Sequence, residues 1–341
     1  MTIPFKNLVQ MWKAQIHKGS RKRIIRRIAT FSVGLLLFFL LIYLSGIEDL
    51  RQLSQIKPLP LIGFFFSTLG IITCVALRWG ILNNALGNEH TVKWHDYFHY
   101  FIVSRVLGFI LPKDVADVGS RAFWLTQFHD VTLRQASASI VLDRLFDLLT
   151  SGTLLMAVLP FWLGWLDASV GYYLMVVAAI VVIVSLCFGH RALANIAAKI
   201  VRQLLVFAGR MPWIGKRIPK SLEVHRVERR ALLFAYGFSV IKFIFTAIRL
   251  TLLGLALHPP IMPQTIILGT PLAQISYVFA FTPGGLGIFE AGWFAILKLG
   301  DAPEASISIF LIGQRVLTAF SVILLAVFSY IIYMLRQSHV H

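Results

Sequence analysis

The sequence predicts an all-α protein that crosses a membrane several times, and two observations carry this prediction. First, 57% of the 341 residues are hydrophobic and only 14% are charged, whereas about 25% charged residues is usual for soluble domains. A soluble fold cannot cover so much apolar surface, so lipid must solvate much of it. Second, the apolar residues gather in runs long enough, or nearly so, to cross about 30 Å of hydrocarbon. These runs lie at 28–45, 60–82, 136–160, 170–189, 231–257 and 306–334.

The formal net charge of +17 supports the same class. In a soluble protein such a charge would suggest nucleic acid, but in membrane proteins Lys and Arg gather on cytoplasmic loops. We therefore expect no nucleic-acid partner. Cys74 and Cys187 both lie inside apolar runs, and we expect no disulfide, no metal site and no cofactor.

Basic segments fix the expected orientation. Residues 1–27 contain Lys and Arg but no acid, and no small-residue cleavage site follows them. They are expected to be a cytoplasmic tail rather than a cleaved signal peptide. Segment 190–230 is also basic and is expected to be an amphipathic cytoplasmic connector, whereas 161–169 has no Lys or Arg and should lie outside. The remaining chain, 28–341, is then a single transmembrane domain of the cell (inner) membrane with both termini in the cytoplasm.

Two apolar stretches are broken by Pro and Gly. Segment 83–135 must begin and end inside, yet its apolar run, 97–111, is about half as long as two spans require. It predicts a re-entrant hairpin that enters from the cytoplasm. Segment 264–299, interrupted at 282–287, predicts a second hairpin that enters from outside. About six full spans and two oppositely oriented hairpins form an inverted-repeat-like arrangement. The alternative is eight full spans, which the loop charges do not exclude.

Charged residues at membrane depth are candidates for function. In the first hairpin these are Arg105 and, near its tip, Lys113, Asp117 and Arg121. A helix that begins near Asp114 would direct its positive end into the hairpin and form a seat for phosphate. The alternative is a solvated loop with a capping Asp.

The next span carries Asp143, Arg144 and Asp147. The two acids lie at i and i+4 and share a helix face, and Arg144 is expected to pair with Asp147 at i+3. For Asp147 we favour a structural ion pair, while Asp143 is a candidate for the site. Arg78, late in span 60–82, could equally extend its side chain to the inner interface.

A second group of cations is deep in the C-terminal half. Lys242 and Arg249, seven residues apart, share a face of span 231–257, and Arg315 lies in the last span. Their counter-charge must come from elsewhere in the bundle or from a ligand, and Glu290 is one candidate. Such cations suit a lipid phosphate, because Arg binds phosphate oxygens in pairs.

The tip of the second hairpin is rich in glycine, with Gly284, Gly285 and Gly287 in sequence. Glycine lets a ligand approach the backbone closely, and a helix that begins near Ile288 would point its N-terminus at the middle of the membrane. A tight turn alone would also require these glycines.

Together, the stretch 111–121, the Asp143-Arg144 pair and the stretch 282–287 with Glu290 and Arg315 resemble the flippase-like transmembrane region of lysylphosphatidylglycerol synthases. The likeness covers nearly the whole chain after residue 28. It implies translocation or handling of a lipid. In the synthases a soluble aminoacyl-transfer domain follows this region. Because the chain ends soon after its last span, lysyl transfer is not expected.

We therefore expect a lipid translocase, not an enzyme, that moves an anionic or modified membrane lipid through a polar cavity between the two hairpins. No G-x-S-x-G or Walker A sequence is present. The alternatives are a non-transporting subunit that handles a lipid-linked intermediate for a separate glycosyltransferase or synthase, and a membrane-embedded transferase. The expected substrate-binding residues are Arg105, Lys113, Asp117, Arg121, Asp143, Lys242, Arg249, Gly284, Gly285, Gly287, Glu290 and Arg315.

Overall fold

Every element that the computed structural model describes is helical. The described residues are 57–87, 92–109, 115–129, 131–209, 228–278 and 286–338, with only the backbone path for 115, 189–209, 277–278 and 336–338. The elements are α3 (Pro58–Ala85), α4 (Trp94–Leu107), a π-helical turn η2 (Val115–Gly119), α5 (Ser120–Phe128), α6 (Leu133–Trp162), α7 (Ala168–Gly209), α8 (Arg229–Ala256), α9 (Pro263–Val278), α10 (Ile288–Leu299) and α11 (Glu304–Ser338). The predicted all-α class is confirmed for this part of the chain.

Helices α3, α6, α7, α8 and α11 are long and apolar enough to cross a membrane. They correspond to five of the six predicted spans, while the predicted span at 28–45 and the tail 1–27 lie outside the described residues. The ends differ by a few residues for local reasons. Helix α3 begins with Pro58, which favours a first helical turn. Helix α6 begins at Leu133 because Thr132 and Gln135 form a capping box.

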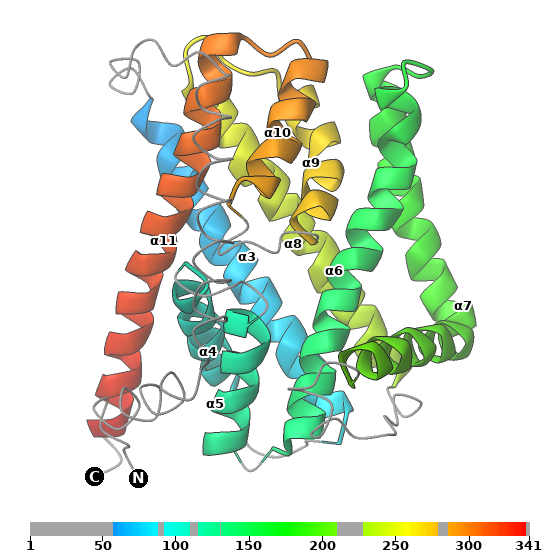
Figure 1. Cartoon of the computed structure of the whole chain (residues 1–341), viewed down its shortest axis with the longest axis vertical. Coiled ribbons are helices and arrows are strands. Elements are labelled where there is room, and N and C mark those ends of the chain that lie inside the picture. Colours follow the sequence, from blue (N-terminus) through cyan, green and yellow to red (C-terminus); the bar gives the residue numbers. More distant parts are fainter. Residues whose placement is uncertain are drawn as a thin grey trace.

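The basic connector differs most from the sequence-based boundaries. Helix α7 does not end near residue 189 but continues to Gly209, and only its first part, Ala168–Phe188, has the composition of a span. Figure 1 shows the last part of α7 turning to run across one end of the bundle. The first half of the predicted connector is therefore helical, and 210–227 lie outside the described residues.

The two broken segments each form a pair of short helices, at opposite ends of the molecule (Figure 1). Helices α4 and α5 lie at one end and pack with α3 and α6 around Trp79. Helices α9 and α10 lie at the other end and pack with α8 and α11 around Trp293. Each pair thus belongs to its own apolar core.

Large apolar side chains cover the outside of α7 and α11. Tyr173 and Phe188 of α7 are 77% and 87% exposed, and Phe320 of α11 is 63% exposed. A soluble monomer rarely exposes such large contiguous apolar surface, whereas a bilayer solvates it.

Candidate functional site

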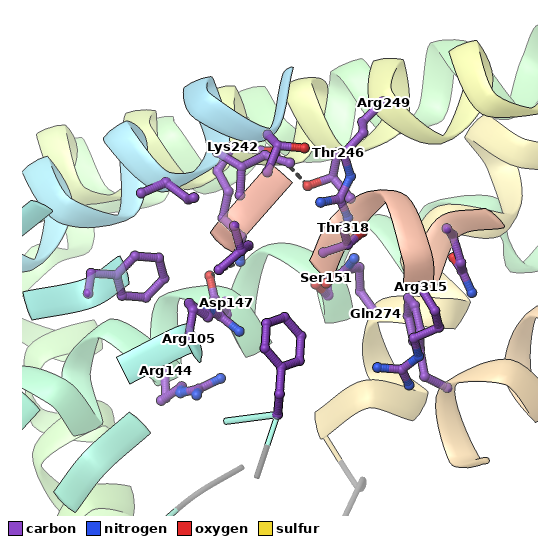
Figure 2. A pocket seen from close by; sticks show the side chains of 18 of the residues that line it. Arg105, Arg144, Asp147, Ser151, Lys242, Thr246, Arg249, Gln274, Arg315 and Thr318 are labelled. Carbon is purple, nitrogen blue, oxygen red and sulfur yellow. Dashed lines mark hydrogen bonds and ion pairs between the residues drawn. The ribbon is translucent and has the colours of Figure 1, made fainter. Parts of the chain in front are cut away.

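A polar cavity of about 340 Å³ lies between the two pairs of short helices. Side chains from α3, α4, η2, α6, α8, α9, α10 and α11 line it, so both helix pairs and four of the long helices contribute. Figure 2 shows polar side chains converging on this space from several helices. The cavity is therefore formed jointly by helices from both halves of the described chain.

Positive charge dominates the lining. Five cationic residues contribute to it, and among the described residues Asp147 is the only acid. The five cations are Arg105, Arg144, Lys242, Arg249 and Arg315.

One face of α8 supplies a central strip of this lining. Lys242, Thr246 and Arg249 lie at i, i+4 and i+7, which places them on one side of the helix. With a rise of 1.5 Å per residue, Lys242 and Arg249 stand roughly 10 Å apart along α8. The prediction that these two cations share a face is confirmed.

The Asp147 carboxylate is already shared between two cations. Its Oδ1 accepts a hydrogen bond from Nη1 of Arg78 at 2.6 Å and one from Nζ of Lys242 at 2.6 Å. Arg144, for which the sequence suggested Asp147 as a partner, donates to Oδ2 of Asp117 in η2. Asp147 faces α3 and α8, while Arg144, one helical position away from Asp143, reaches toward the first hairpin.

A buried ionic network lies beside the cavity. Arg78 donates from Nε to Asp143 at 2.6 Å and from Nη1 to Ser239 at 2.7 Å. Asp143 also accepts from Arg121 at 3.0 Å, and Arg121 lies 3.4 Å from Asp117. The network joins α3, α6, α8 and the first hairpin, and it therefore holds these elements together beside the cavity.

The structure decides the position of Arg78, which the sequence left open. This side chain does not extend to an interface: its exposed fraction is 0%. A buried cation is tolerated only when it is paired and hydrogen-bonded. Asp143 and Asp147, which share a face of α6, supply that pairing. The signal for this was available in the sequence, since two acids at i and i+4 in an apolar span require cations from another helix.

The second hairpin is held by Glu290. Its Oε2 accepts a hydrogen bond from the backbone N–H of Gly287 at 2.8 Å, and its Oε1 accepts one from Arg315 of α11. Gly287 has φ = 83°, a left-handed conformation that favours glycine. Helix α10 begins at Ile288, as predicted. The prediction that Glu290 pairs with a cation is confirmed, and the cation is Arg315.

Three of the cavity arginines stack on aromatic rings. The guanidinium carbons of Arg105, Arg249 and Arg315 lie 4.7, 5.3 and 5.7 Å from the ring centres of Phe101, Phe64 and Phe289, respectively. Such stacking holds the planar group by its face, whereas its N–H donors lie at its edge. The rings therefore help to hold these three guanidinium groups at the cavity, and Arg315 is held by Glu290 as well.

The structure divides the predicted site residues into three groups. Arg105, Lys242, Arg249 and Arg315 line the cavity. Asp117, Arg121, Asp143, Gly287 and Glu290 do not line it but support residues that do. Lys113, Gly284 and Gly285 lie outside the described residues. The phosphate seat at the first hairpin tip therefore stays a prediction.

Several polar residues of the lining are not among the predicted substrate-binding residues, and the longest of them are Arg144, Gln274 and Gln314. Arg144 had been assigned only to a structural pair, and uncharged Gln carries little signal in a single sequence. Their role follows from the way α6, α9 and α11 meet.

Comparison with known proteins identifies the family. The model for the lysylphosphatidylglycerol synthase TM region matches residues 25–326. The chain belongs to this family. No curated protein and no solved structure matches the chain. The family match and the long apolar helices together identify a multi-pass membrane protein. Membership of the lysylphosphatidylglycerol synthase TM-region family is compatible with a function related to membrane lipids.

Proposed function

We propose that the chain is a lipid translocase that moves a membrane lipid with a phosphate-containing headgroup between leaflets. The observation that carries the proposal is the cationic cavity between the two pairs of short helices. Charged residues inside a membrane protein are costly and mark pathways for polar substrates. In this account the headgroup crosses through the cavity while the acyl chains remain in the bilayer.

The size of the cavity supports a headgroup as its occupant. A volume of about 340 Å³ is near the lower end for small-molecule pockets. It suits a phosphate with a small polar substituent, but two acyl chains would not fit beside it. The five cations supply the charge that a phosphate needs in a water-poor space.

We also propose that the two helix pairs are re-entrant hairpins related as inverted repeats, with both termini in the cytoplasm of a cell membrane. Helices α4, α9 and α10 have 14, 16 and 12 residues, or roughly 21, 24 and 18 Å at 1.5 Å per residue. These lengths fall short of the ~30 Å hydrocarbon core, which favours hairpins over eight full spans. Their positions at opposite ends of the bundle (Figure 1) suit an inverted repeat.

The proposal gives the chain no catalytic step of its own. The movement it describes is downhill, coupled to an ion, or driven by a partner. A membrane subunit that serves a separate lipid-modifying enzyme remains the competing function, and the assay below separates the two.

Reconstitution tests the proposal. Purified chain is placed in liposomes that contain a trace of phosphatidylglycerol with a fluorescent acyl chain, and a membrane-impermeant reductant quenches the outer leaflet. Translocation predicts quenching well beyond the outer-leaflet half seen in protein-free liposomes. Quenching equal to that of protein-free liposomes, from a chain that elutes as a single folded species, would contradict it. Loss of a co-purifying enzyme's activity on deletion of the chain would then favour the subunit.

A further inference from the structure

The acidic groups in and beside the cavity are already bound by cations of the protein, and this limits the charge of the lipid that can bind there. We infer that the cavity selects a lipid with a net anionic headgroup and rejects one whose headgroup is net cationic, and that Arg249, Gln314 and Arg315 hold the phosphate. This inference rests on the proposed function only in taking a lipid headgroup as the occupant.

The first step concerns the carboxylate that faces the cavity. A cationic headgroup needs a carboxylate to replace the water it leaves. Asp147, the only acid among the described lining residues, is already bound by Arg78 and Lys242, each at 2.6 Å. An incoming ammonium group would have to displace one of these cations, and Arg78 is fully buried.

The neighbouring acids are engaged as well. Glu290 has an exposed fraction of 0% and binds Gly287 and Arg315. Asp143 binds Arg78 and Arg121, and both acids lie outside the lining. Asp117 binds Arg144 and Arg121 in the same way. The described lining therefore presents a cationic headgroup with an excess of positive charge and no open carboxylate.

The second step concerns Gln314, which is 3% exposed and lines the cavity. Neither atom of its amide, Nε2 nor Oε1, has a hydrogen-bond partner within the described structure. A buried amide without partners costs free energy, so one facing a cavity indicates that a ligand or water completes it. Its NH₂ group can donate to a phosphate oxygen.

The third step places the phosphate within the cavity. Figure 2 shows Arg105, Arg144 and Asp147 toward one end and Arg249 and Arg315 toward the other. Gln314 precedes Arg315 in α11, and both line the cavity. The buried Gln314 amide, which has no hydrogen-bond partner within the described structure, therefore places the phosphate at the second end, beside Arg249 and Arg315. The guanidinium groups of Arg249 and Arg315 lie over the rings of Phe64 and Phe289. A guanidinium held in this way binds a phosphate through the N–H groups at its edge.

Competition binding tests the selectivity. Fluorescent phosphatidylglycerol is bound to the purified full-length chain in neutral detergent and displaced with lipids that share its acyl chains. The competitors are phosphatidylglycerol (net −1), phosphatidylcholine (net 0) and lysyl-phosphatidylglycerol (net +1). We expect phosphatidylglycerol to compete about tenfold better than phosphatidylcholine, the scale of one charge-assisted hydrogen bond, and the lysylated lipid to compete least. Equal or stronger competition by the lysylated lipid overturns the inference.

A substitution tests the subsite. Gln314→Leu removes the amide at similar volume and leaves every charge in place. We expect it to weaken phosphatidylglycerol binding about tenfold and to keep or raise the thermal unfolding midpoint without lipid, because a buried amide without partners is lost. Gln264→Leu, at an exposed position on α9, is the matched control and should change neither. Unchanged affinity of Gln314→Leu for phosphatidylglycerol would contradict the claim that Gln314 helps to hold the phosphate.

The two proposals fail separately. Equal binding of all three lipids together with translocation of the labelled lipid contradicts the selectivity and leaves the proposed function standing. Selective binding without any translocation contradicts the proposed function and leaves the selectivity standing.

Discussion

At the scale of single residues, two buried and two half-buried cations are paired with three acids. Arg78, Arg121, Arg144 and Lys242 share Asp117, Asp143 and Asp147. Such pairs gain little over apolar packing when intact, but the removal of one partner leaves an uncompensated charge. The network therefore acts as a frame whose members depend on one another.

Asp143→Asn tests this dependence. The change deprives Arg78 and Arg121 of a buried carboxylate and should destabilise the protein by about 3–5 kcal/mol, read as a clear fall in the thermal unfolding midpoint in detergent. Asp167→Asn, at an exposed position between α6 and α7, removes the same charge and should leave the midpoint unchanged. Equal midpoints for the two variants would show that the network is not a structural frame.

Sequence reasoning found most of these charges but not their partners. Helical periodicity placed Asp143 and Asp147 on one face of α6, which the structure confirms through Arg78. Periodicity does not tell which helix that face meets. The sequence therefore suggested Asp147 as the partner of Arg144 and left the position of Arg78 open. The partner of a charge depends on packing between helices, which a single sequence does not encode locally.

At the scale of elements, the second hairpin depends on how α10 begins. Gly287 adopts φ = 83°, and its N–H is bonded to Glu290, which also binds α11 through Arg315. One turn thus joins the backbone of α10 to a cavity arginine. A disturbance of this turn should reach the cavity.

Gly287→Ala tests the turn. A Cβ in the left-handed region costs about 1–2 kcal/mol, so we expect a lower unfolding midpoint and weaker phosphatidylglycerol binding. Gly237→Ala is the control, because a Cβ at that helical position of α8 meets nothing within 4 Å, and alanine favours the helix. If the two variants behave alike, the special conformation of Gly287 contributes nothing.

The long elements were easier to predict than the short ones. Runs of apolar residues located α3, α6, α8 and α11 to within a few residues, because their length is set by the bilayer. The extension of α7 to Gly209 was missed, since a basic segment loses the hydropathy signal while remaining helical. The short helices were predicted as hairpins only because Pro and Gly interrupt their apolar runs.

At the scale of the whole molecule, two helix pairs lie at opposite ends of the bundle with a cationic cavity between them. Each pair has its own apolar core, around Trp79 or Trp293. The cavity lies where the two cores end. Under the proposed topology, each side of the membrane contributes one wall to a common site.

Cysteine labelling tests the orientation. In a background with Cys74→Ala and Cys187→Ser, a single cysteine is introduced at Trp165, which is 73% exposed, or at Lys93, which is also exposed. An impermeant thiol reagent added to intact cells should label Trp165→Cys at once and Lys93→Cys only after permeabilisation. The reverse pattern would invert the proposed topology.

The measurement that bears most directly on the central claim compares two charge-matched double variants in the liposome assay. Arg105→Gln with Arg249→Gln removes two cations from the cavity, and Arg229→Gln with Arg230→Gln removes two from the exposed start of α8. We predict at least a tenfold slower translocation of fluorescent phosphatidylglycerol for the cavity variant, at an unchanged unfolding midpoint, and a wild-type rate for the α8 variant. A folded cavity variant that translocates the lipid as fast as wild type would contradict the claim that this cavity carries the headgroup.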